Sequence, residues 1–255
     1  MCLWDTQKSG IRNLVNINLY TNKIRNLEDE KMRLNDNSTP MSAIDYDKKI
    51  NNTIPYYMEF YDQTFSVVIQ KNFLAIRWLD LGCGTGRLES KAVRLFPDIQ
   101  FVMVDPSEKM LEQAKEKNSN IQAQYICTGS DSIDFCDEFE VVTAIQSHHY
   151  MNQEGREKAT HNVHCALRKG GIYITFENVI PESLEVKEFE LQRWGKYQLE
   201  HGKSEPEVKE HIARCGVNYF PLTINQHIDL LKSCGFKSIH VFWYSYMQMG
   251  LYAIK

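Results

Sequence analysis

The sequence lacks three features that would point to a membrane, a nucleic acid or a metal. No apolar run approaches the roughly 20 residues needed to span a bilayer, and the first residues hold no apolar core of a secretion signal. The formal net charge is −4 and no block of lysines or arginines occurs, so direct binding to nucleic acid is not expected. The seven cysteines include no CxxC pair and no zinc-finger spacing, so we predict reduced thiols and no metal site. These absences predict a cytoplasmic protein that acts on a small molecule and has no membrane partner.

The chain has enough apolar sequence for one sizeable core, since 43% of its 255 residues are hydrophobic. Residues 1–43 are polar and only weakly periodic, and we predict a partly disordered N-terminal extension there. Residues 44–255 are predicted to form one α/β domain. Within this domain, residues 181–221 carry charged helical patterns and are too long for a plain loop, so a helical insertion is predicted.

Strand and helix patterns alternate along the domain, which predicts a parallel sheet with right-handed crossovers. The predicted strands are residues 78–81, 100–105, 121–127, 140–146 and 172–177, followed by a tail of two strands from Ser238 that turns near Gln248 and Gly250. Helix caps are predicted at Ser107 and in the capping box of Thr223 and Gln226. The pair Gly170-Gly171 is predicted to stop a helix over residues 153–168.

The most informative stretch is Trp78 to Gly86, WLDLGCGTG, where a short apolar strand runs into a glycine turn. Glycine at every second position lets the backbone approach a ligand and adopt dihedral angles that a Cβ would forbid. The next predicted strand ends in Asp105, about 20 residues beyond the glycines, where a carboxylate commonly holds a ribose diol. The two features together predict a site for a nucleotide-type cofactor.

These residues resemble the class I S-adenosylmethionine-dependent methyltransferases, whose first motif has the form (D/E)xGxGxG. The motif corresponds to Asp80–Gly86 here, and three further matches follow in the family's order: Asp105-Pro106 through Leu111, Gly129-Ser130-Asp131, and Leu167 through Ile174. The resemblance spans about Tyr57 to Lys255. It implies a Rossmann-like sheet of seven mostly parallel strands with an antiparallel last strand, helices on both faces, and a helical lid. It also implies S-adenosylmethionine as the methyl donor and S-adenosylhomocysteine as the product.

A dinucleotide is the competing cofactor, because dehydrogenases use GxGxxG to hold a pyrophosphate. The spacing here is GxGxG, and Asp80 stands two positions ahead of the first glycine, where it would repel two phosphates. A methionine moiety instead carries an ammonium group, for which a nearby carboxylate is favourable. The sequence therefore favours the methyl donor over NAD.

The resemblance also implies roles for particular residues in binding the donor. The glycine turn would hold the methionine portion, Asp105 the ribose and Met110 the adenine ring, with Ser130 or Asp131 at the adenine amino group. Tyr57 would belong to a lid helix opened by Ile54-Pro55-Tyr56-Tyr57, although core packing of its ring explains the pattern equally well. The full set of predicted donor-binding residues is Tyr57, Asp80, Gly82, Cys83, Gly84, Gly86, Asp105, Pro106, Met110, Ser130, Asp131 and Gln146.

Candidate catalytic residues follow the fourth strand, in Gln146-Ser147-His148-His149-Tyr150. The Asn/Asp-Pro-Pro-Tyr/Phe motif of adenine and glutamine methyltransferases is absent there, which argues against a planar nitrogen as acceptor. His148 or His149 could take a proton from the acceptor, because imidazole titrates near working pH. The alternative is that these histidines serve packing. His161 and His164 have helical spacing but no third ligand, so no metal is predicted there.

A closer resemblance joins the C-terminal part of the chain to the carboxy-S-adenosylmethionine synthases, which make a carboxymethyl donor using prephenate. It rests on Ile54–Tyr57, on Ala213-Arg214 through Thr223, and on the segments around Cys234 and from Gly250 to Lys255. In that family an arginine grips the extra carboxylate across a dimer, which implies this role for Arg214 and a homodimer. An Arg214 that only solvates a helix edge is the alternative.

The chain departs from the synthases in its loop, Gly82-Cys83-Gly84-Thr85-Gly86, and in Gln146–Tyr150. We therefore predict a methyltransferase that acts on a small molecule. A carboxy-S-adenosylmethionine synthase is the first alternative, and an S-adenosylmethionine-binding regulator without turnover is the second.

Overall fold

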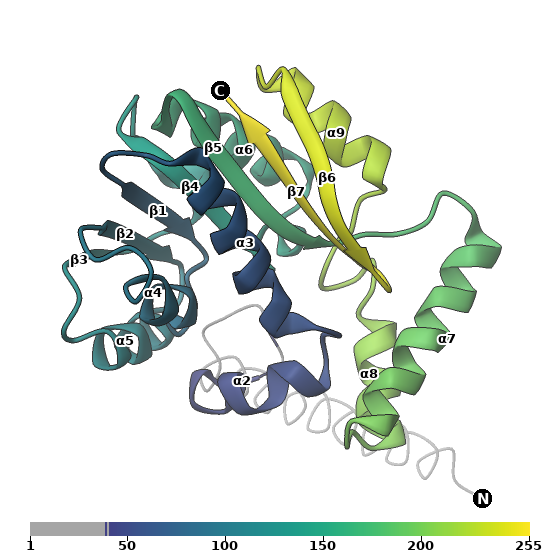
Figure 1. The fold of residues 1–255 in the computed structure, drawn as a ribbon. Coiled ribbons are helices and arrows are strands. Elements are labelled where there is room, and N and C mark those ends of the chain that lie inside the picture. Colours follow the sequence, from purple (N-terminus) through teal and green to yellow (C-terminus); the bar gives the residue numbers. More distant parts are fainter. Residues whose placement is uncertain (1–38, 40) are drawn as a thin grey trace, which may run out of the picture. The chain divides into compact units, whose positions relative to one another are not determined.

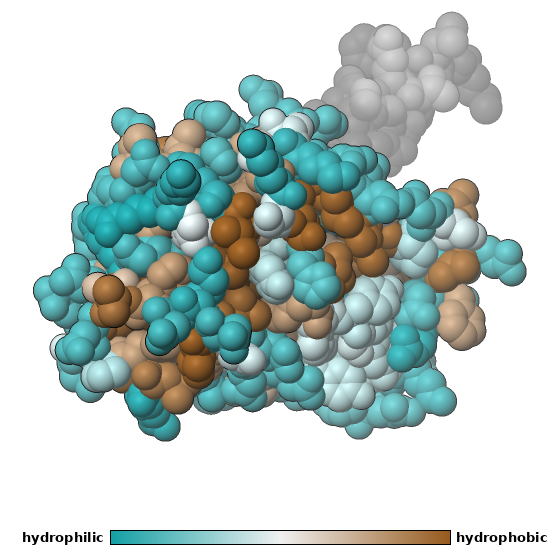
Figure 2. All heavy atoms as spheres, turned by 45° about the horizontal axis from the view of Figure 1, so that its top comes forward, coloured by the Kyte–Doolittle hydropathy of each residue, from teal (hydrophilic) through white to brown (hydrophobic). Residues whose placement is uncertain are grey.

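The computed structural model of the protein describes residue 39 and residues 41–255, so the extension predicted over residues 1–43 lies almost wholly outside the described residues. From Ala43 to Lys255 the chain forms one compact unit. Figure 1 shows this unit as a twisted central sheet with helices packed against it. On the face seen in Figure 2, hydrophilic residues surround smaller apolar areas.

The sheet has seven strands in the order β3-β2-β1-β4-β5-β7-β6. The strands are β1 Arg77–Leu81, β2 Gln100–Asp105, β3 Ala123–Cys127, β4 Phe139–Ile145, β5 Leu167–Asn178, β6 Ser238–Ser245 and β7 Gln248–Ile254. Neighbours from β3 through β5 pair in parallel, whereas β7 is antiparallel to both β5 and β6. The predicted Rossmann-like sheet with an antiparallel last strand is confirmed. The strand order reverses between β1 and β4, so the carboxyl ends of these two strands flank the crevice where ligands bind in such sheets.

The helices cover both faces of the sheet (Figure 1). They are α2 Ala43–Lys49, α3 Tyr57–Lys71, α4 Arg87–Ala92, α5 Glu108–Lys117, α6 Gln153–Ala166, α7 Leu184–Glu200, α8 Glu205–Ala213 and α9 Ile224–Ser233, with single 3₁₀ turns at Ile50–Asn52, Ser130–Ser132 and His148–Tyr150. Successive side chains of strand β5 point to opposite faces of the sheet. The ring of Phe176 stacks on Phe60 of α3, with centroids 4.5 Å apart, whereas Tyr173 faces the opposite side and stacks on Phe236 after α9.

Two predicted helix starts are confirmed by their hydrogen bonds. The Ser107 side chain accepts the N–H of Met110 at the start of α5. Thr223 and Gln226 form a reciprocal capping box at the start of α9. The insertion predicted over residues 181–221 contains the two helices α7 and α8.

Several predicted boundaries were wrong. Gly170-Gly171 does not stop a helix, because α6 ends at Ala166 and the chain enters β5 directly at Leu167. Gly170 is a left-handed residue within that strand, with φ +79° and its N–H bonded to the Lys255 carbonyl. The third strand begins at Ala123 rather than 121, and the turn of the last hairpin lies before Gln248 rather than near Gly250.

Candidate functional site

The glycine turn after β1 has the geometry that the sequence predicts, and its three glycines serve different purposes. All three have positive φ, +73° at Gly82, +55° at Gly84 and +70° at Gly86. A Cβ on Gly82 would lie 2.4 Å from the Cβ of Ser147, and one on Gly86 would lie 2.2 Å from the side-chain nitrogen of Asn118. A Cβ on Gly84 would meet no atom within 4 Å. Gly82 and Gly86 are therefore required for packing, whereas Gly84 faces open space into which a ligand can come close.

Asp105 at the end of β2 ties the glycine turn to the next loop. One carboxylate oxygen accepts the Gly84 N–H at 2.9 Å, and the other accepts the Ser107 N–H at 2.9 Å. A carboxylate oxygen accepts more than one hydrogen bond, so Asp105 is suited chemically to bind the hydroxyls of a ribose. The predicted position of Asp105 beside the turn is therefore found.

Asp80 lies beneath the turn rather than in it. Its carboxyl accepts the hydroxyl of Thr143 on β4 at 2.5 Å, and that hydroxyl in turn accepts the indole N–H of Trp78 at 2.8 Å. Burial raises the pKa of Asp80 to about 6, in part offset by hydrogen bonds from Thr143 and Glu89. Burial also raises the pKa of Glu89 on α4 well above its ordinary value, and the charge of Asp80 adds to the effect. The two carboxyls thus form a buried acidic pair whose raised pKa values favour their protonated forms.

The sequence analysis did not identify Glu89 as a residue of this site. The only available signal was its position, three residues after Gly86. Cys83, in the turn itself, is buried, and burial followed by the charge of Glu89 raises the pKa of its thiol. A thiol that stays protonated is a poor nucleophile, so Cys83 serves as a packing residue.

The remaining predicted donor contacts lie at the ends of β2 and β3. Met110 is buried in the first turn of α5, and Pro106 follows Asp105 directly. Ser130 and Asp131 form the 3₁₀ turn after β3, where the Ser130 carbonyl accepts the side-chain N–H of Asn162. The sheet order brings all of these positions to the same edge as the glycine turn.

A short helix that the sequence analysis missed, α2, covers the glycine turn. Its Asp47 accepts the hydroxyl of Thr85 at 2.8 Å and forms an ion pair with Lys117 of α5, while Arg87 donates to the Asp47 carbonyl at 3.4 Å. The Tyr61 hydroxyl donates to the Tyr57 hydroxyl at 2.9 Å, so two phenols of α3 are linked. A cofactor bound at the turn would lie close to α2, which would then form a lid held by Asp47.

We expect Asp47→Ala to loosen this lid and to speed dissociation of S-adenosylhomocysteine by about tenfold. The reason is that the substitution removes two hydrogen-bonded contacts, one of them ionic, each contributing on the order of 1 kcal/mol. Stopped-flow competition measures the off-rate, and Asp45→Ala on the same helix is the control. An unchanged off-rate would show that α2 does not restrain the ligand.

Gln146, the residue that follows β4, holds a strained backbone at the same edge. Its φ is +55°, its N–H donates to the Phe176 carbonyl at 2.7 Å, and its side chain donates to the same carbonyl at 3.4 Å. The next residue, Ser147, donates its hydroxyl to the Leu81 carbonyl at 2.9 Å. Left-handed residues other than glycine occur where surrounding bonds hold them, often at functional sites.

His148 and His149 were predicted at a strand end, and both are buried. The rings point to different partners: His149 Nδ1 lies 2.9 Å from a carboxylate oxygen of Glu177, and His148 Nδ1 lies 3.3 Å from the Tyr173 hydroxyl. Burial lowers the pKa of His148 to about 4, so this imidazole is neutral at physiological pH. The sequence analysis missed Glu177, whose only signal was its place at the end of the fifth strand.

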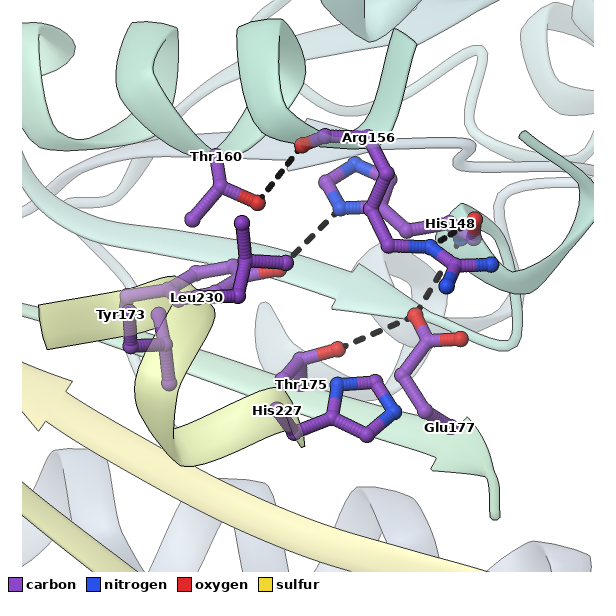
Figure 3. A pocket seen from close by; sticks show the side chains of 9 residues that line it. His148, Arg156, Thr160, Tyr173, Thr175, Glu177, His227 and Leu230 are labelled. Carbon is purple, nitrogen blue, oxygen red and sulfur yellow. Dashed lines mark hydrogen bonds between the residues drawn. The ribbon is translucent and has the colours of Figure 1, made fainter. Parts of the chain in front are cut away.

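His148 lines a small cavity whose other lining side chains include none of the glycine turn (Figure 3). The cavity has about 20 Å³, room for one or two water molecules, and is lined by side chains of β5, α6 and α9 that include Arg156, Glu177 and His227. Within the described part of the chain, the Nε2 atoms of His148 and His227 are buried without a hydrogen-bond partner. These nitrogens are the polar atoms that water in the cavity could satisfy.

Arg214 directly follows α8, and its positive charge acts on Tyr150 in the predicted catalytic segment. Burial raises the pKa of Tyr150 to about 12, while the Arg214 guanidinium acts in the opposite direction. The insertion therefore brings one positive charge toward the end of β4. In the described residues no group of three or more His, Cys, Asp or Glu side chains could hold a metal ion, and no helix is long and apolar enough to cross a membrane.

Comparison with known proteins gives the fold and its distant relatives. The family described as a methyltransferase domain matches residues 79–171. The carboxy-S-adenosyl-L-methionine synthase of Nautilia profundicola is 25% identical over 77% of this chain and 84% of the relative, and that of Staphylococcus epidermidis is 25% identical over 84% and 94%.

Two solved structures of low sequence identity share the fold of this chain. The YcgJ protein of Bacillus subtilis has a TM-score of 0.53 at 17% identity, covering 71% of each chain. The [4+2]-cyclase SpnF has a TM-score of 0.51 at 20% identity, covering 71% of this chain and 59% of its own. The domain match, the strand order and the collinear relatives lead to one assignment: the chain contains a class I S-adenosylmethionine-dependent methyltransferase domain and is a distant homologue of the carboxy-S-adenosyl-L-methionine synthases.

Proposed function

We propose that the protein transfers a methyl group from S-adenosylmethionine to a small-molecule acceptor, with S-adenosylhomocysteine as the second product. The observation that carries the proposal is the turn at Gly84, which leaves open space next to Asp105 at the switch point of the sheet. A Cβ would fill that space, so the residues present fit a ligand that approaches the backbone. The donor supplies an electrophilic methyl group, and the protein's part is to hold the acceptor in line with it and exclude water.

The acceptor site would lie between the ends of β4 and β5, the lid α2–α3 and the insertion. Its described side chains include Tyr57, Tyr150 and Arg214. The formal net charge of −4 favours a small molecule over a nucleic acid as the acceptor. A homodimer is also proposed, on the basis of the resemblance of Arg214 to the synthase arginine.

Calorimetric titration of purified protein with S-adenosylmethionine, S-adenosylhomocysteine and NAD tests the donor assignment. We expect both sulfur nucleosides to bind and NAD to give no heat. Incubation with donor and pools of metabolites, followed by mass spectrometry for donor-dependent gain of one methyl group, then identifies the acceptor. Donor binding with no methylated product from any pool would favour a regulator without turnover.

Asp105→Ala is expected to weaken binding of S-adenosylhomocysteine by tenfold or more, the rough scale for losing charge-assisted hydrogen bonds. Asp105→Asn keeps the shape and one acceptor oxygen, so it should bind with intermediate affinity. The measurements are calorimetric affinity and thermal melting, because Asp105 also holds the N–H groups of Gly84 and Ser107. Unchanged affinity in the alanine variant would contradict the ribose role.

A second candidate is synthesis of a carboxymethyl donor, as the names of the relatives suggest. Arg214 supports it, because a guanidinium near Tyr150 could pair with the extra carboxylate. Mass spectrometry of the nucleoside released on denaturing freshly purified protein separates the candidates. A carboxylated S-adenosylmethionine would replace our proposal with this one, whereas S-adenosylmethionine or S-adenosylhomocysteine would support methyl transfer.

A further inference from the structure

Glu177, the carboxylate beside His149, is enclosed by hydrogen-bond donors. It lies near the end of β5 and is 1% exposed. One oxygen accepts the backbone N–H of His148 at 3.1 Å and lies 3.2 Å from the Thr175 hydroxyl, whose shorter hydrogen bond, at 2.7 Å, goes to the Ala144 carbonyl. The other accepts the backbone N–H of His149 at 2.9 Å and lies 2.9 Å from its Nδ1. Figure 3 shows the carboxylate among the side chains that line the cavity.

This enclosure determines which nitrogen of His149 carries a proton. Burial alone would raise the pKa of Glu177, but the hydrogen bond from His149 brings it to about 2, so the carboxylate is ionised. An ionised carboxylate can only accept hydrogen bonds. The Nδ1 atom of His149 must therefore be the donor, and in the neutral ring Nε2 then presents a lone pair.

The other neighbours of the His149 ring are aromatic. The ring of Tyr150 lies 4.4 Å away and that of Tyr219 meets it edge-on at 6.0 Å, measured between centroids. The Tyr219 hydroxyl is buried beside the Cys215 thiol. A hydrogen-bond acceptor, His149 Nε2, between two aromatic rings is what a site for an aromatic ligand with one polar group offers.

We propose that Glu177 is a positioning residue that presents His149 Nε2 as the base for an acceptor bearing an aromatic hydroxyl. The proposal rests on the proposed methyl transfer. The acceptor oxygen forms a bond to the methyl carbon as the carbon–sulfur bond breaks, and that electron pair stays on sulfur. The hydroxyl proton passes to Nε2, and the imidazolium formed is stabilised by the Glu177 carboxylate. A hydroxyl needs such a base, whereas a thiol ionises far more readily.

The first test reads the tautomer directly and needs no turnover. Long-range ¹H–¹⁵N spectra of protein labelled on histidine, with the His149 signals assigned by their loss in His149→Gln, should show a proton on Nδ1 and none on Nε2. In Glu177→Gln the side-chain amide can donate to Nδ1, so the proton should move to Nε2. His227→Gln, on the other side of the same cavity, is the matched control and should leave the His149 tautomer unchanged. An Nε2–H tautomer in the wild-type protein would overturn the proposal.

The second test compares oxygen and sulfur acceptors of the same shape. A panel of substituted phenols and the matching thiophenols is offered with S-adenosylmethionine. For the phenol that reacts best, His149→Gln and Glu177→Gln should lower kcat at least about 100-fold, with a much smaller loss for its thiophenol. Equal losses for both acceptors would show a structural role and refute the base.

The outcomes of these experiments distinguish a failure of the methyltransferase proposal from a failure of the role assigned to Glu177. No calorimetric binding of S-adenosylhomocysteine to wild type would refute the methyltransferase proposal. Binding combined with the wrong tautomer would refute the role of Glu177 alone. Methylation of other metabolites, with none of the phenols accepted, would refute the acceptor class.

Discussion

Gly84→Ala is expected to lower the affinity for S-adenosylhomocysteine by roughly 100-fold, equivalent to about 2.7 kcal/mol. A Cβ at this position meets no protein atom within 4 Å, so it would project into the space that we assign to the ligand. The backbone must also keep φ near +55°, which costs a residue with a Cβ about 1 kcal/mol of stability. The variant should therefore fold, with a modestly lowered melting temperature, and fail to bind.

Gly170→Ala is the matched control for this experiment. Gly170 also has a positive φ, +79°, and a Cβ on it would also meet no atom within 4 Å, but it lies at the other end of β5. It should show the same loss of thermal stability with unchanged calorimetric affinity. If both variants bound the nucleoside like wild type, the glycine turn would not be the donor site.

Gly82 and Gly86 pack against other side chains, whereas Gly84 does not, and the sequence alone does not show this difference. The pattern GxGxG predicted the turn and its positive φ values, because only glycine adopts them at low cost. It could not show that Gly82 faces Ser147 and Gly86 faces Asn118, since both contacts join residues more than 30 positions apart. The alternation of short apolar strands with helical patterns likewise predicted the sheet, because strands that are buried on both faces are recognisable as short apolar runs.

The parts of the site that the sequence analysis missed depend on contacts between distant residues. The lid helix α2 has seven residues, too few for a clear period, and it is held by Asp47 through Thr85 and Lys117. Glu177 was missed because an acidic residue at a strand end looks solvated until the turn at His148–Tyr150 folds over it. Asp80 was predicted at the ligand, whereas the structure gives it Thr143 and Glu89 as partners. Its contribution to binding remains a prediction.

The Asp80–Glu89 pair gives the second large expected effect, which is on stability. Both carboxyls have pKa values raised by burial, that of Asp80 from 3.8 to about 6. A carboxyl whose pKa is higher in the folded state contributes stability below its unfolded pKa and loses it as pH rises through the folded pKa. We therefore expect the pair to destabilise the native protein progressively above pH 4, and most strongly above pH 6.

Glu89→Gln should remove this penalty and raise the free energy of unfolding at pH 8 by about 1–3 kcal/mol, the general scale for a buried group that lacks its hydrogen-bond partner. The glutamine amide has nearly the same size and shape as the carboxyl group, and it does not titrate. Urea unfolding at pH 4, 6 and 8 measures the difference between variant and wild type, which should be near zero at pH 4 and grow with pH. Glu116→Gln, on the exposed side of α5, should stay within about 0.5 kcal/mol at every pH. A Glu89→Gln protein less stable than wild type at pH 8 would mean that the native fold requires an ionised Glu89, which would contradict its raised pKa.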